Sequence, residues 1–226
     1  MSRVRIRFWK LRITSSLLII AMASIAYGAS DAQREFDAVL SSKPDAAHGQ
    51  QIFVICAPCH GAYGGGTPDG RIPAIAGQHF RVIAAQLVDF RHDQRWDALM
   101  EHFSDAHNLG QTSDVADVAA YISRLQPVYT SDVGDGKFVS NGSKLYARSC
   151  ASCHGTAGNG ENRRGYPRLA GQHYGYLLRQ MHDAVDGRRP NFNRAHVRLL
   201  AGLDRSDFEA LADYLARSGR ESVVAP

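Results

Sequence analysis

Two stretches of the chain carry apolar residues spaced three to four positions apart. These residues are Val115, Val118, Ala119, Ile122 and Leu125 in the first stretch and Phe208, Leu211, Ala212 and Leu215 in the second. Residues at this spacing lie on one face of an α-helix, so both stretches predict amphipathic helices that bury one side. Ser206 and Glu209 have the spacing of a capping box, which predicts where the second helix begins.

Further helices are predicted elsewhere in the chain. The segments Ala46 to Ala57, His79 to Arg91, Gly142 to Ser152 and His173 to Val185 are compatible with helices joined by glycine-rich loops. No stretch alternates apolar and polar residues for long enough to indicate a sheet. The pattern therefore predicts an all-α fold.

The second half of the chain repeats the first at an offset of 94 residues. The matched residues include Cys56 with Cys150, Pro73 with Pro167, the sequence Ala-Gly-Gln-His at 76–79 with that at 170–173, Gln86 with Gln180, and Leu109 with Leu203. Beyond Leu109 the offset is 93, which pairs Tyr121 with Tyr214. Because a fixed offset indicates tandem units, we expect domains over 29–126 and 141–226 and a linker over 127–140.

The first 28 residues have the pattern of a secretory signal peptide. They contain five basic residues and no acidic residue, followed by an apolar run from Leu17 to Ala26 and small residues. The run is too short for a membrane span, which needs about 20 apolar residues. We therefore expect export to the periplasm with cleavage, and association with the membrane if the leader is retained.

Composition and charge limit the function classes. The chain has 226 residues, 44% of them hydrophobic and 21% charged, which excludes a disordered or multi-span membrane protein. Its formal charge of +4 comes from the leader, because the rest of the chain has 21 basic and 22 acidic residues. A nearly neutral body argues against a nucleic-acid partner.

The four cysteines predict two covalently bound haem c groups. They form Cys56-Ala-Pro-Cys59-His60 and Cys150-Ala-Ser-Cys153-His154, two copies of C-x-x-C-H. In this pattern the thiols add to the haem vinyl groups and the adjacent imidazole binds iron. A thioredoxin-like redox pair does not need the following His, and structural zinc sites usually have four ligands at other spacings.

Several further motifs, in fixed order, carry a resemblance to a known family. Each C-x-x-C-H is followed by Gly, then by Pro73-Ala-Ile-Ala-Gly-Gln78 or Pro167-Arg-Leu-Ala-Gly-Gln172, and later by Val118-Ala-Ala-Tyr121 or Leu211-Ala-Asp-Tyr214. In these motifs the chain resembles the di-haem class I cytochromes c of the cytochrome c4 type. The resemblance implies two tandem cytochrome c domains, each wrapped around one haem. It also implies that the carbonyls of Pro73 and Pro167 accept hydrogen bonds from the proximal ligands His60 and His154.

The sixth iron ligand departs from the family pattern. Class I cytochromes c supply Met seven residues before the Leu that precedes the last helix, whereas this chain has His102 and His196 there. We therefore expect two imidazole ligands on both irons, which lowers the reduction potential relative to methionine ligation. Met100 remains an alternative ligand for the first haem, although its counterpart in the second half is Arg194.

The remaining histidines and the glycine loops have simpler interpretations. His79 and His173 each begin a predicted helix, where we expect a propionate contact or a helix cap. We expect solvent exposure or local hydrogen bonds for four other histidines, which are His48, His92, His107 and His182. The loops 64–66 and 158–160 are interpreted as haem-edge loops, because no P-loop Lys-Ser/Thr follows them.

These features predict an exported electron-transfer protein with no catalytic residues and no small-molecule substrate. The resemblance implies protein donors and acceptors, including membrane-bound oxidases or reductases. A haem-bearing subunit docked on a dehydrogenase or oxidase is one alternative. A di-haem peroxidase or a thiosulfate dehydrogenase is another, but it needs an open or distinctively ligated iron, and no Cys remains to act as a ligand.

Overall fold

The computed structural model describes residues 31–219, so the predicted leader lies outside the described part of the chain. A helix over 31–41 comes first. The first half then contains α2 (Ala46–Ile52), a 3₁₀ turn (Phe53–Ile55), α3 (Ala57–His60), α4 (Phe80–Arg91), α5 (Ala98–Ser104) and α6 (Thr112–Arg124). The second half contains α7 (Val139–Ser149), α8 (Ala151–His154), α9 (Tyr174–Val185), α10 (Arg194–Ala201) and α11 (Arg205–Arg217).

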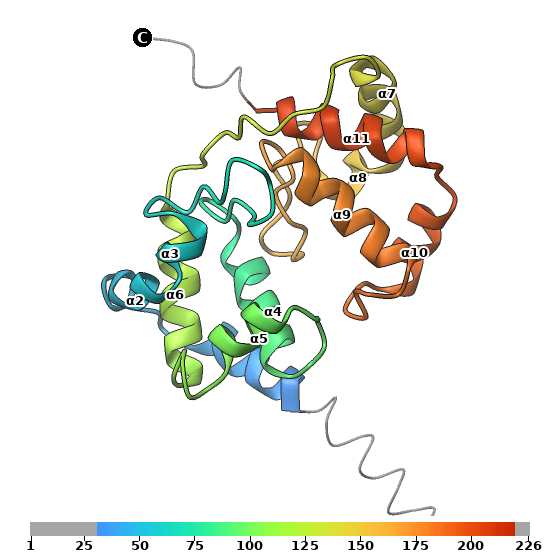
Figure 1. The fold of residues 1–226 in the computed structure, drawn as a ribbon. Coiled ribbons are helices and arrows are strands. Elements are labelled where there is room, and N and C mark those ends of the chain that lie inside the picture. Colours follow the sequence, from blue (N-terminus) through green and yellow to red (C-terminus); the bar gives the residue numbers. More distant parts are fainter. Residues whose placement is uncertain (1–30, 220–226) are drawn as a thin grey trace, which may run out of the picture.

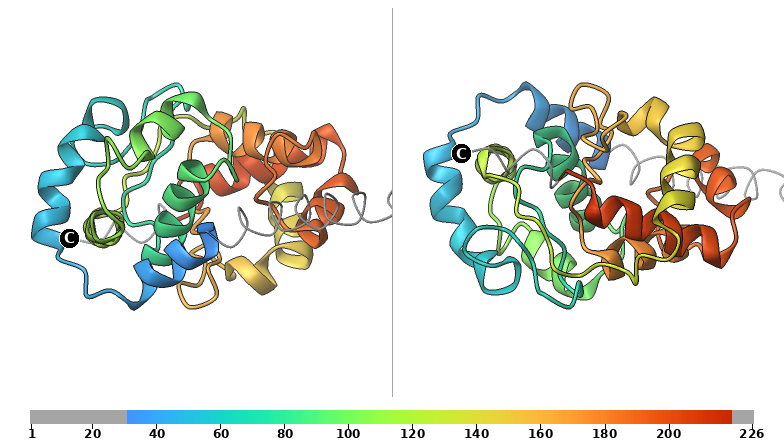
Figure 2. Two further views of the ribbon diagram at one scale, coloured as in Figure 1. Left: turned by 90° about the horizontal axis from the view of Figure 1, so that it is seen from below. Right: turned by 90° about the horizontal axis from the view of Figure 1, so that it is seen from above.

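The prediction of an all-α fold is confirmed. Residues 31–219 contain no named strand, and their one isolated β-bridge joins Glu161 to Tyr166. None of the helices in this range is long and apolar enough to cross a membrane. The two halves form separate groups of helices that lie side by side, and the segment between α6 and α7 connects them (Figures 1 and 2).

Several predicted boundaries differ from those in the structure. The helix expected over 46–57 is divided into α2, the 3₁₀ turn and α3. Pro58 lies in the first turn of α3, where its missing N–H is tolerated but cannot continue a preceding helix. In the second half, α7 begins at Val139, inside the segment expected to be linker.

The predicted capping box of Ser206 and Glu209 is wrong. The box is formed by Asp204 and Asp207, because α11 begins at Arg205 and Asp204 is its N-cap. The Asp204 carboxylate accepts from the backbone N–H of Asp207, while the Asp207 carboxylate accepts from the N–H of Asp204. Ser206 lies inside the first turn and donates its hydroxyl to Asp204 instead.

In each half, the helix before the C-x-x-C-H motif packs against the last helix at a glycine. A Cβ atom on Gly49 of α2 would lie 2.0 Å from the carbonyl oxygen of Asp117 in α6. A Cβ atom on Gly142 of α7 would lie 2.0 Å from the carbonyl oxygen of Ala210 in α11. Both helix pairs therefore approach backbone to backbone, which fixes the position of the motif relative to the last helix.

The connection between the halves is held against the second half. Asp213 of α11 accepts hydrogen bonds from the backbone N–H groups of Gly134 and Gly136, at 3.0 and 2.8 Å. Arg217 binds both the Asp213 carboxylate and the Gly134 carbonyl. Asp213 is only 3% exposed, so this segment is attached at a buried charged group.

We predict that Gly142→Ala destabilises the second half. Alanine ordinarily stabilises a helix interior relative to glycine by about 0.5–1 kcal/mol, but here the added methyl group collides with the Ala210 carbonyl. Overpacking of this kind typically costs about 1–3 kcal/mol. Thermal unfolding followed by circular dichroism measures the effect. Gly202→Ala is the control, because its Cβ would meet its nearest atom at an ordinary 3.5 Å. Equal stability of the two variants would contradict the prediction.

Candidate haem sites

The two C-x-x-C-H histidines are buried and held in the same way. The side chains lie at the ends of α3 and α8, where His60 is 7% and His154 is 9% exposed. The Nδ1 atom of His60 lies 3.0 Å from the carbonyl oxygen of Pro73, and that of His154 lies 3.1 Å from the carbonyl oxygen of Pro167. A carbonyl only accepts, so Nδ1 carries the proton and Nε2 keeps a free lone pair for a metal ion.

Burial keeps both imidazoles in the form that binds iron. It lowers the pKa of His60 and of His154, because a charged imidazolium is disfavoured away from water. The hydrogen bonds to the proline carbonyls act in the opposite direction but are the smaller effect. The neutral imidazole is therefore favoured in both halves.

The proline carbonyls are positioned by glycines in the loops expected to line the haem edge. Gly66 and Gly160 have positive φ angles of 75° and 71°. A Cβ atom on Gly66 would lie 2.7 Å from the Pro73 carbonyl oxygen, and one on Gly160 would lie 2.6 Å from the Pro167 carbonyl oxygen. A side chain at either position would displace the group that orients the histidine.

The donor set in each half fits a covalently bound haem. All four cysteines are free thiols, with Cys59 and Cys153 exposed and Cys56 and Cys150 half-buried. Burial raises the pKa of the Cys56 and Cys150 thiols to about 11, so both are protonated at neutral pH. In each half, two thiols and one neutral imidazole lie within five consecutive residues around a single helical turn, and they match the bonds that haem c makes through its vinyl groups and its iron.

The second half also brings a distal candidate opposite the proximal histidine. His196 is the third residue of α10, and its backbone N–H donates to the Asn193 side chain at 2.8 Å. The His154 and His196 ring centroids are 6.1 Å apart. Metal–nitrogen bonds to imidazole are about 2 Å long, so two imidazoles that share one metal ion have centroids about 6 Å apart. The separation fits two ligands of one iron.

In the first half, the helix that corresponds to α10 begins at a different position of the repeat. Its distal helix α5 begins at Ala98, and the Asp97 side chain accepts from the backbone N–H of Met100 at 3.1 Å. Met100 is thus the third residue of α5, as His196 is of α10, whereas His102 lies two residues further on. Met100 is half-buried and His102 is exposed. Among the ring contacts found within 31–219, His102 pairs with Phe103 rather than with His60.

His79 and His173 do not act as helix caps, contrary to one of the two roles expected for them. They occupy the N-cap positions of α4 and α9, but neither side chain makes a capping bond. Instead, each ring crosses to the other half. His79 Nε2 lies 2.8 Å from the Asn159 carbonyl oxygen, and His173 Nε2 lies 2.8 Å from the Gly65 carbonyl oxygen. These histidines join the two halves, which no local sequence signal indicated.

Three of the other histidines contact side chains that are distant in sequence but belong to the same half. His48 binds Asp117 at 2.8 Å, and His92 binds Glu35 at 2.6 Å. The His182 ring packs edge-on against Phe208 at a centroid distance of 5.1 Å. His107 is exposed.

Comparisons with known proteins agree with this architecture. The Cytochrome c family model matches residues 46–126 and 139–218. Cytochrome c4 of Pseudomonas aeruginosa is 30% identical over 211 residues, which cover 90% of this chain and 96% of that protein. The thiosulfate dehydrogenase electron acceptor of Stutzerimonas stutzeri is 28% identical over 204 residues, 81% of this chain and 92% of that protein.

A solved structure extends the likeness to three dimensions. The crystal structure of reduced recombinant cytochrome c4 from Pseudomonas stutzeri matches with a TM-score of 0.70 and 28% identity, covering 78% of this chain and all of that one. The chain therefore belongs to the cytochrome c family, as a di-haem cytochrome of the c4 type with one covalently bound haem c in each half.

Proposed function

We propose that this protein relays single electrons between protein partners, through two irons that each have a protein ligand on both sides. The observation that carries this proposal is the pair of facing rings of His154 and His196, at 6.1 Å. An iron held from both sides has no open position for a substrate. It also rearranges little when its oxidation state changes, as an electron carrier requires.

The proposal assigns both axial ligands of the second haem and one of the first. His154 and His196 bind the second haem. His60 binds the first haem, together with Met100 or with His102. Repeat alignment favours His102, while the helix register and the burial of α5 favour Met100. Since a thioether raises the potential relative to imidazole, Met100 ligation makes the first haem the more oxidising, and electrons run downhill from the second haem to the first.

The partners are redox proteins in the periplasm. The predicted leader over 1–28 supports export, and the nearly neutral body argues against nucleic acid. The relative named as a thiosulfate dehydrogenase electron acceptor supports a dehydrogenase as one class of donor. A membrane-bound oxidase or reductase is the proposed acceptor. Permanent docking on such a complex is the alternative, and copurification of a partner would favour it.

Axial-ligand variants test the proposal. In the ferric holoprotein, we expect near-infrared magnetic circular dichroism to show a Met-to-iron charge-transfer band from half of the haem and a bis-imidazole signal from the rest. Met100→Leu removes the Met band, whereas the matched variant His102→Gln leaves it. His196→Met adds a second Met band and raises one potential by on the order of 0.1 V, since axial ligands set haem potentials over about 0.8 V.

Each alternative gives a distinct result in the same experiment. A wild-type spectrum without a Met band, together with loss of one bis-imidazole signal in His102→Gln, assigns His102 to the first haem. An unchanged spectrum and titration in His196→Met removes His196 from the second haem.

A substitution beside the Pro167 carbonyl should raise the reduction potential of the second haem. Gly160→Ala places a methyl group 2.6 Å from the Pro167 carbonyl oxygen and therefore weakens its bond to His154. A less strongly hydrogen-bonded imidazole stabilises ferric iron less, so redox titration should show a higher potential for the second haem. Gly187→Ala is the control, because its φ of 74° carries the same backbone strain with no atom within 4 Å. An equal shift in both variants would attribute the effect to strain alone.

The enzyme alternative is tested with peroxide. An electron carrier with both iron faces ligated should reduce hydrogen peroxide no faster than free haem c peptide does. Steady-state peroxide consumption by the reduced protein, with a fixed electron donor, makes this comparison. Saturable turnover together with a high-spin ferric signal would contradict the proposal.

A further inference from the structure

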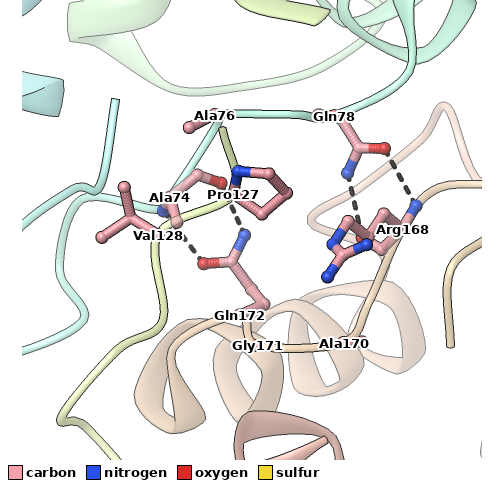
Figure 3. A pocket seen from close by; sticks show the side chains of 9 residues that line it. All are labelled: Ala74, Ala76, Gln78, Pro127, Val128, Arg168, Ala170, Gly171 and Gln172. Carbon is pink, nitrogen blue, oxygen red and sulfur yellow. Dashed lines mark hydrogen bonds between the residues drawn. The ribbon is translucent and has the colours of Figure 1, made fainter. Parts of the chain in front are cut away.

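Two glutamines form a reciprocal contact between the halves. Gln78 and Gln172 occupy equivalent positions in the repeat, and each side chain reaches the backbone of the opposite half (Figure 3). Gln172 Oε1 accepts from the N–H of Ala74 at 3.0 Å, and its Nε2 donates to the Ala74 carbonyl at 2.7 Å. Gln78 Oε1 accepts from the N–H of Arg168 at 2.9 Å, and its Nε2 donates to the Arg168 carbonyl at 2.9 Å.

The amide orientation of both glutamines is determined by their partners. A backbone N–H only donates and a carbonyl only accepts, so Oε1 must face the former and Nε2 the latter. Each Oε1 also accepts from the following backbone N–H, that of His79 or of His173, at 3.0 Å. Three hydrogen bonds hold each side chain. The Oε1 acceptor therefore has a fixed position relative to the backbone of the opposite half.

The N–H bound by each glutamine belongs to the peptide group that orients a proximal histidine. The carbonyl of Pro73 and the N–H of Ala74 are two ends of one planar amide. The carbonyl accepts from His60 and the N–H donates to Gln172. In the other half, the amide between Pro167 and Arg168 joins His154 to Gln78 in the same manner.

Hydrogen bonds in such a chain strengthen one another. When an amide N–H donates to an acceptor, its carbonyl oxygen becomes more negative and accepts more strongly, by about 10–30% per bond. A stronger bond at Nδ1 makes the imidazole a better donor to iron, which favours the ferric state. The side chain of one half can therefore act on the haem of the other.

We propose that the two halves tune each other's haem: Gln172 lowers the potential of the first haem through the Pro73–Ala74 peptide, and Gln78 lowers that of the second through the Pro167–Arg168 peptide. Both glutamines are positioning residues, since they act through the peptide and the histidine. The proposal rests on His60 and His154 binding the irons. It does not depend on which side chain is the distal ligand of the first haem.

Single variants in the full-length holoprotein test the crossed effect. Gln172→Met keeps the approximate volume but removes the acceptor and the donor. We expect the ferrous-to-ferric ratio of the first haem at fixed potential to rise about twofold, a shift of about 18 mV at 59 mV per tenfold, while the second haem is unchanged. In Gln78→Met, we expect the same rise for the second haem and no change for the first. His196→Met in the same background marks which titration step belongs to the second haem.

Two controls separate tuning from packing. Tyr176→Phe removes the 2.9 Å bond from Arg95, which also crosses between the halves but does not touch either proximal peptide. It should leave both potentials unchanged. Gln172→Glu retains an acceptor oxygen beside Ala74 and should not raise the potential of the first haem. The Nδ1 proton resonance of the proximal histidine, measured by NMR, should move only in the half opposite the substituted glutamine.

Three outcomes overturn the proposal. They are equal shifts of both haems in a glutamine variant, a shift of the haem in the same half, and no shift at all. Failure of the proposed axial ligands is distinguishable, because it shows in the His196→Met spectrum while the glutamine variants keep the wild-type ligand bands.

Discussion

The hydrogen bond from a buried proximal imidazole to a proline carbonyl is the constraint on which the rest of each half depends. It fixes the tautomer of His60 and of His154, so that Nε2 keeps a free lone pair for the iron that we propose each of them binds. The carbonyl itself can lie there only because the loop that passes beside it has a glycine with positive φ. The helix that precedes each C-x-x-C-H motif, α2 or α7, is placed in turn by a backbone contact at Gly49 or Gly142. A change at any of these positions therefore alters the position of the imidazole or of the carbonyl that it binds.

Duplication explains why the contacts between the halves occur in pairs. A residue that reaches across from one half has a repeat partner that reaches back, as His79 and His173 do. The arginines Arg95 and Arg189 behave similarly, because each donates to Gln86 and to Gln180 at 2.6 to 2.9 Å. One favourable residue in the ancestral unit thus contributes twice. The directional polar contacts fix the relative orientation of the halves, while each cluster of buried apolar residues lies within one half.

The all-α fold, the duplication and the cofactor can be predicted from the sequence because each depends on a pattern of residues along the chain. Four cysteines in two C-x-x-C-H motifs are informative by themselves, and helical periodicity identifies α6 and α11. The contacts of Gln78 and His79 could not be predicted in this way, since they depend on how two domains are placed in space. The capping box of α11 could not be predicted for a local reason: two candidate starts, Asp204 and Ser206, lie two residues apart, and Asp and Ser are about equally favoured as N-caps.

The distal side shows where repeat alignment and structure give different answers. Alignment by offset assumes that equivalent residues occupy equivalent turns, but α5 begins two residues earlier in the repeat than α10 does. The reason is the position of the N-cap side chain, Asp97 in one half and Asn193 in the other, each of which accepts from the N–H three residues later. The N-cap sets where a helix begins. A cap that lies two residues earlier therefore places each aligned side chain about 200° further around the helix, at 100° per residue. His102 and Met100 consequently lie on opposite faces of α5, and only one of them can face the first iron. If Met100 is the ligand, as we propose on the helix register, two halves with nearly the same proximal side hold their irons at different potentials, and internal electron transfer has a direction.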